Sequence, residues 1–185
     1  MSVRKFVGEL ERVESSLAQG TEGPPVLATF LVTTSMDAVD YVARFRAVLS
    51  AAIRTANQAD FDSETISEAL IPDWFAEVTC GSIAVGRDDE ASSGSRHYVS
   101  RRGEEPWELQ DWLFCFDPQL RGWAWWDLTR LSHSTVLLWV DSSGEPAFPC
   151  EEFRWLAYAC GAKNVDGPVV RRLSEWRQSR QDPAT

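Results

Sequence analysis

The sequence predicts a single α+β domain, in which helices from both ends of the chain cover a small, mostly antiparallel sheet. Its length of 185 residues is close to that of one domain. Three strand-like runs, at about 109–116, 122–130 and 135–141, follow one another closely. Because the connections are too short for a crossover helix, these strands should pair antiparallel. Apolar stripes at helical spacing lie before and after them.

The first half of the chain supplies helices and further candidate strands. A helix face opens the chain, formed by Phe6, Leu10, Val13 and Leu17. Residues 26–32 are almost entirely apolar, which is typical of a buried strand, and residues 82–85 form another candidate strand. Ser35 is a candidate N-cap for a long amphipathic helix that ends near Asn57. The pair Thr65 and Glu68 matches a capping box and predicts a shorter helix.

Residues 86–106 differ in composition from their surroundings. This segment is rich in Ser, Gly and charged residues, and it has few apolar residues that could anchor it to a core. Long segments of this kind are usually mobile or functional. We therefore expect a mobile loop here.

The second half predicts a β-meander followed by two helices. Residues 117–119 and 131–134 have the composition of turns between the three strands. Pro149 precedes a helix with acidic residues in its first turn, and Gly161 ends that helix. A last helix is expected at about 169–178, before a polar C-terminal tail.

The stretch GWAWWDL at 122–128 contains three tryptophans in four positions. In a regular strand Trp123, Trp125 and Asp127 would share one face, and Trp126 the other. Both faces begin apolar and end polar, which indicates a central strand that emerges toward solvent near Arg130. We expect these rings to fill the core. The alternative is that some of them line a groove for a ligand or partner.

The charge is concentrated in the middle third of the chain. The formal net charge is −10, and residues 61–120 contribute −9 of it, with 13 acidic and 4 basic side chains. Binding to nucleic acid requires the opposite sign, so this class is excluded. The chain shows no signal peptide, no run long enough to cross a membrane, and no CxxC pair among its four cysteines. We expect a cytoplasmic protein with reduced thiols and no metal or cofactor.

Catalytic motifs are sparse. Asp127 and Asp141 lie near the ends of neighbouring expected strands, and with His133 they could line a pocket gated by segment 86–106. A triad of Ser132 or Ser134 with His133 and Asp127 or Asp141 is a weaker alternative, because the GxSxG motif of such hydrolases is absent. A thiol enzyme using Cys80 or Cys150 with a distant His is about as weak. Glycine-rich nucleotide-binding loops are also absent. A small enzyme or ligand-binding domain is therefore the second hypothesis.

The first hypothesis is a non-enzymatic acidic protein that binds a basic protein partner, as an immunity or inhibitor protein binds a toxic enzyme. Complementary charge would speed the encounter, and aromatic rings would anchor the partner. The candidate binding residues are Asp88, Asp89, Glu90, Glu104, Glu105, Glu108, Asp111, Trp107 and Trp112.

Overall fold

The computed structural model describes residues 6, 8–15, 17–18, 20–79 and 90–180. Its helices are α1 (Glu9–Glu14), α2 (Ala38–Ala56), α3 (Asp73–Val78), α4 (Glu90–Arg102), α5 (Leu109–Phe114), α6 (Glu151–Ala159) and α7 (Leu173–Ser179). Its strands are β1 (Val26–Thr34), β2 (Ala124–Ser132), β3 (Thr135–Asp141) and β4 (Ala162–Arg172). The α+β class and the helices from both ends of the chain are therefore confirmed.

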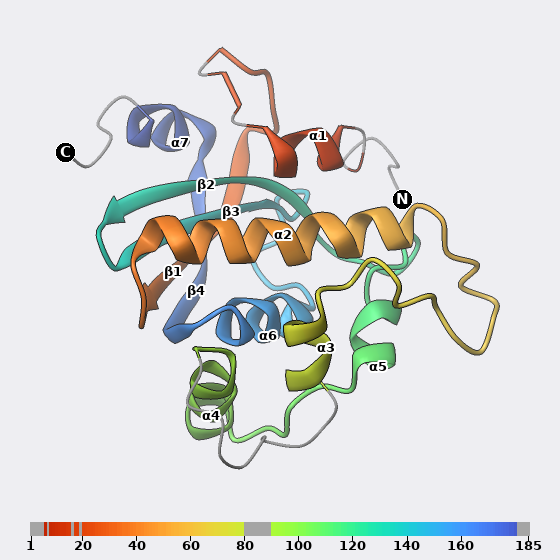
Figure 1. The fold of residues 1–185 in the computed structure, drawn as a ribbon. Helices are drawn as coiled ribbons and strands as arrows, with labels where there is room; N and C mark the ends of the chain where they lie inside the picture. The colour runs from red at the N-terminus through yellow and green to blue at the C-terminus, as the bar shows by residue number, and fades with distance from the viewer. Residues whose placement is uncertain (1–5, 7, 16, 19, 80–89, 181–185) are drawn as a thin grey trace.

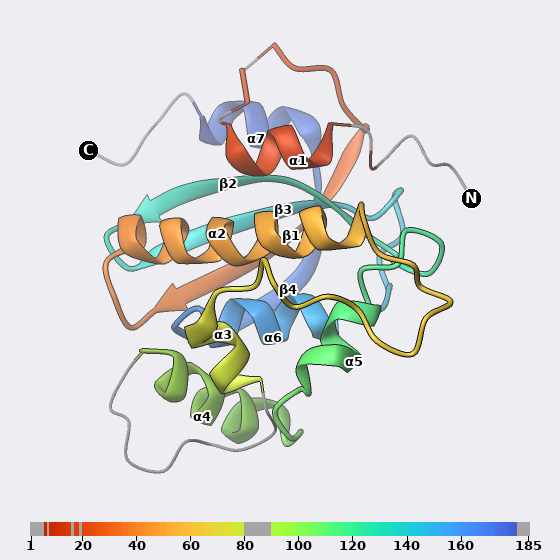
Figure 2. The same cartoon turned by 45° about the vertical axis from the view of Figure 1, so that its right-hand side comes forward.

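The four strands form one antiparallel sheet in the order β2-β3-β1-β4. The hairpin β2–β3 and strand β1 lie where the sequence predicts them, but β2 is an edge strand rather than the central strand that the sequence indicated. In Figures 1 and 2, α2 and α6 lie on one side of the sheet and α7 on the other, while α1 runs beside β2. Helices α3, α4 and α5 gather on the far side of α6, and α4 also contacts β4.

Aromatic side chains form the centre of the larger core, between the sheet and helices α2 and α6. Phe153 of α6 contacts the rings of Phe45 on α2, Phe30 on β1 and Trp123 before β2. A smaller cluster under α7 joins Trp126, Trp139 and other side chains to Trp176. The expectation that the tryptophans of segment 122–128 fill the interior is borne out, because all three are at most 5% exposed.

A bulge in β2 changes the predicted alternation. Trp125 pairs with Val140 and Asp127 pairs with Trp139, so Trp126 is the extra residue. Trp123 and Trp125 face the larger core, whereas Trp126 packs in the smaller cluster. Asp127 bonds to Trp176 in that smaller cluster. The prediction that Asp127 shares a face with Trp123 and Trp125 is therefore wrong.

Two segments were predicted as irregular or extended but are helical. Residues 109–114 form α5 rather than a strand, with Leu109, Trp112 and Leu113 on its buried face. Within the expected loop 86–106, residues 90–102 form α4. Its buried side consists of small residues and Tyr98, and a Cβ on Gly94 would lie only 1.7 Å from the carbonyl oxygen of Tyr158 on α6. These small residues let α4 approach α6 closely, and the one large buried side chain, Tyr98, contacts the rings of Trp155 and Tyr158.

Three further boundaries differ from the prediction. Residues 60–68 contain no helix, and the next helix begins only after Pro72. The N-cap of α2 is Asp37, whose carboxylate accepts a hydrogen bond from the amide of Val39; Ser35 instead donates to Glu90 and to Gly161. Strand β4 occupies 162–172, where the sequence predicted the connection after Gly161 and the start of the last helix. Residues 82–85 lie outside the described residues.

Candidate functional site

Two fully described segments carry most of the negative charge. Residues 60–79 and 104–120 contain eleven acidic and no basic side chains. The rest of the chain carries 18 basic and 17 acidic side chains, so it is close to neutral. The net charge of this protein is therefore a local property of two segments.

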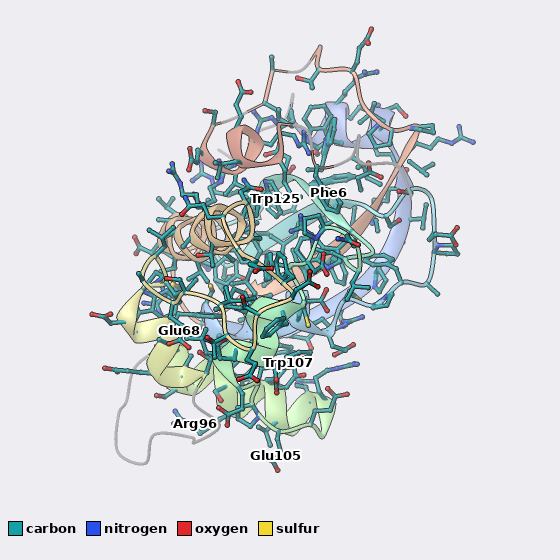
Figure 3. All side chains as sticks on the ribbon, turned by 90° about the vertical axis from the view of Figure 1, so that its right-hand side faces the viewer. Phe6, Glu68, Arg96, Glu105, Trp107 and Trp125 are labelled. Atoms are coloured by element: carbon teal, nitrogen blue, oxygen red, sulfur yellow. The ribbon has the colours of Figure 1, made fainter. Side chains whose placement is uncertain are left out.

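These two segments pack against each other. The side-chain amide of Gln110 on α5 donates to the carbonyl oxygen of Ile66 (3.0 Å) and accepts from its N–H (2.9 Å). It also donates to the carboxylate of Glu68. The rings of Phe61 and Phe114 pack edge to face with their centroids 6.3 Å apart. The ring of Phe75 on α3 packs on that of Trp112. Figure 3 looks onto this side of the molecule, where Glu68, Trp107 and Glu105 are labelled.

Most carboxylates on this side have no basic partner among the residues that the structure describes. We use the name acidic face for Asp60, Asp62, Glu64, Glu68, Asp73, Glu104, Glu105, Glu108, Asp111 and Asp117. All of these are exposed except the half-buried Asp117. Within the described parts of the chain, none of the ten forms an ion pair. A surface of this kind projects a negative potential into solvent.

The candidate binding residues are divided by the structure. Glu104, Glu105, Glu108 and Asp111 belong to the acidic face. Glu90 begins α4 and accepts a hydrogen bond from the hydroxyl of Ser35 (2.6 Å), so it is not one of this group. Asp88 and Asp89 lie outside the described residues. The acidic residues of segment 60–73 were not among the residues predicted from the sequence. Their run of negative charge without a basic residue could have identified them.

The two candidate tryptophans have different environments. Trp112 is fully buried, and its indole N–H donates to the carbonyl oxygen of Glu152 (2.9 Å). It is a core residue, so its selection as a surface anchor is wrong. Trp107 is half-buried and donates to the hydroxyl of Tyr98 (3.1 Å), which donates to Glu104 (2.9 Å). This chain of hydrogen bonds holds segment 104–107 on α4.

Asp127 is enclosed rather than open to a pocket. Its side chain is 0% exposed, lies 3.4 Å from Arg46 and 3.3 Å from Arg180, and accepts a hydrogen bond from the indole of Trp176 (2.9 Å). Desolvation raises the pKa of Asp127, although the indole and the two arginines oppose that shift. This geometry attaches α2 and the end of α7 to the sheet.

The other members of the candidate catalytic set lie apart. His133 is exposed in the turn before β3, and Asp141 ends that strand at its opposite end. The carboxylate of Asp141 accepts a hydrogen bond from the amide of Ser143. The three residues therefore do not converge. A shallow hollow of about 430 Å³ beside His133 is lined by Lys163 and Asp37 among others, but by neither Asp127 nor Asp141.

Metal-binding and thiol chemistry gain no support from the described residues. No group of three or more His, Cys, Asp or Glu side chains in these parts of the chain could hold a metal ion. Burial raises the pKa of the Cys115 thiol to about 12 and also raises the pKa of Cys150, which disfavours the reactive thiolate. Cys80 is not among the described residues.

Comparison of the chain with protein-family models, with curated proteins and with solved structures gave no significant match. Among the described helices, none combines the length and the apolar character needed to cross a membrane.

Proposed function

We propose that this protein is a non-enzymatic, cytoplasmic binding protein whose acidic face docks onto a basic protein, in the manner of an immunity or inhibitor protein. One observation carries the proposal: ten carboxylates on two segments that pack together have no basic partner among the described residues. Such a surface attracts a positively charged partner and selects against acidic ones.

The contrast with the remaining carboxylates supports this proposal. Elsewhere the chain places Arg beside Glu9, Glu14, Asp127 and Glu151. Arginines are therefore available in this protein, yet none of the 37 residues in the two acidic segments is basic. Like charges held close together destabilise a free protein, and a basic partner relieves this repulsion.

Affinity capture from an extract of the producing cells tests the proposal. We expect a basic protein to be retained at about 50 mM salt and released at about 500 mM, because salt screens exposed charges. The triple variant Glu64→Gln, Glu108→Gln, Asp111→Asn should lose it. The matched control Glu22→Gln, Glu145→Gln, Asp166→Asn removes three exposed carboxylates outside the acidic face and should retain it.

Equal capture by the two triple variants would contradict the proposal, as would a partner that is acidic or insensitive to salt. If the protein were instead a small enzyme, the second hypothesis, mutation of Asp127, His133 or Asp141 would reduce its catalytic activity. The separation of these three residues does not favour that hypothesis.

A further inference from the structure

A cavity opens within the acidic face, between the C-terminal end of α2 and the segment that follows it. Its volume is about 370 Å³, which is near the lower end of the range for ligand pockets. The lining residues are Thr55, Gln58, Ala59, Asp60, Ser63, Thr65, Ile66, Ser67, Ala69 and Leu70. We infer that this cavity receives an arginine side chain of the basic partner, an inference that rests on the proposed function.

The lining of the cavity suits the two parts of an arginine side chain. Ala59, Ile66, Ala69 and Leu70 provide apolar surface for its methylene stem, and Leu70 is 47% exposed. Hydroxyls, an amide and the carboxylate of Asp60 provide acceptors for its head group. A guanidinium carries five N–H donors and no acceptor, so it matches a wall of several acceptors better than an ammonium does.

The rim of the cavity carries the charge that would draw in a cation. Asp62, Glu64 and Glu68 alternate with lining residues along the same segment and are exposed. None of them forms an ion pair in the described parts of the chain. Arg54, on the last turn of α2, is already paired with Glu14 at 2.5 Å.

A buried polar group in the wall is a second, independent indication of a ligand. Thr55 is 5% exposed, and its hydroxyl has no hydrogen-bond partner among the described residues. A buried hydroxyl without a partner destabilises the free protein. The hydroxyl oxygen lies just beneath the cavity surface, so an N–H donor that enters the cavity and displaces the atoms covering this oxygen would remove that penalty.

The first test uses a small probe, so that it does not depend on the identity of the partner. The ¹⁵N-labelled protein is titrated with N-acetyl-arginine amide, and N-acetyl-lysine amide serves as a control of equal charge. We expect saturable shifts in the millimolar range at the amides of Thr55, Gln58 and Ser67 with the arginine probe. Shifts spread evenly over the acidic face, or equal binding of the lysine probe, would overturn the inference.

Two substitutions separate binding from folding. Ala69→Trp fills the cavity without changing charge and should abolish these shifts, whereas Ala47→Trp, at an exposed site on α2 outside the cavity, should not. Thr55→Val keeps the shape of the side chain but removes its hydroxyl. It should weaken binding of the arginine probe about tenfold while raising the Tm by about 2–4 °C. An unchanged affinity in Thr55→Val or in Ala69→Trp would refute the inference.

The same variants distinguish the two proposals. If the wild-type protein captures a basic partner and Ala69→Trp captures it equally well, the acidic face binds the partner without the cavity. If the arginine probe binds in the cavity but no salt-sensitive basic protein is captured, the proposed function fails and the arginine site stands.

Discussion

Carboxylates near α1 and α7 and those of the acidic face have opposite environments. Glu9 is 2% exposed, and its carboxylate lies 2.5 Å from the guanidinium of Arg121. The same carboxylate accepts a hydrogen bond from the backbone amide of Trp125. Asp127 is likewise buried between two arginines. On the acidic face the carboxylates are exposed, apart from the half-buried Asp117, and have no ion pair in the described residues. The first group holds elements together, and the second group faces solvent.

The difference matters because a buried charge and an exposed one affect stability differently. A buried carboxylate must be compensated by hydrogen bonds and a countercharge, and removing it leaves its partner buried. An exposed carboxylate is solvated, so its removal has little effect on folding. The loss of free energy of unfolding on mutation should therefore be large for the buried carboxylates and small for the exposed ones. This difference can be measured without knowing any partner.

The largest effect is expected for Glu9→Ala. The substitution removes the carboxylate that compensates the buried Arg121 and that satisfies the amide of Trp125. The free energy of unfolding should fall by about 3–5 kcal/mol. Urea denaturation followed by tryptophan fluorescence measures it. A loss below about 0.5 kcal/mol, the range of surface substitutions, would show that the buried Glu9–Arg121 pair contributes no more to stability than an ion pair at the surface.

A smaller, pH-dependent effect is expected for Asp127→Asn. The pKa of Asp127 is raised by burial, so the folded state binds its proton more readily than the unfolded state does. The stability that Asp127 contributes is thus fully present below the unfolded pKa of about 3.9 and is lost as the pH rises through the folded pKa. Asparagine does not titrate. Relative to the wild type, the variant should become more stable as the pH rises from about 4 to 7.

Urea denaturation of both proteins at several pH values measures this difference. A shift in the opposite direction would mean that Arg46 and Arg180 outweigh desolvation and hold the carboxylate in its charged form.

The smallest effect on stability is expected on the acidic face. Glu64→Gln, Glu108→Gln and Asp111→Asn should each change the free energy of unfolding by less than about 0.5 kcal/mol, because the side chains are exposed and form no ion pair with any described residue. Thermal unfolding monitored by circular dichroism provides the measurement. A loss above about 1 kcal/mol at any of them would show a structural role and remove that residue from the acidic face.

The sequence predicted the long helix α2, strand β1, the hairpin β2–β3 and helix α6 from periodicity and turn residues. It misassigned α5, although Leu109, Trp112, Leu113 and Phe116 have helical spacing, because a short apolar run fits either period. Helix α4 was missed for another reason. Its buried side depends on the close approach of Gly94 to α6, and composition alone does not reveal such a contact.

The candidate site was predicted in part. Glu104, Glu105, Glu108 and Asp111 were identified from local charge, and they lie on the acidic face. Trp112 was wrongly assigned to the binding surface, because the sequence alone does not distinguish a tryptophan that anchors a partner from one that fills the core. The cavity beside Thr55 was not foreseen, since its walls come from the end of a helix and an irregular segment.

By itself the sequence determined the class of fold, the aromatic core and the placement of nearly all net charge in the middle third. Which carboxylates are neutralised was decided only by the tertiary structure. Glu9 and Arg121 are 112 positions apart, and Arg46 and Asp127 are 81 apart. Local propensity carries no information over such separations. Packing of α1, α2 and α7 around the sheet brings these charges together and leaves the acidic face with no ion pair among the described residues.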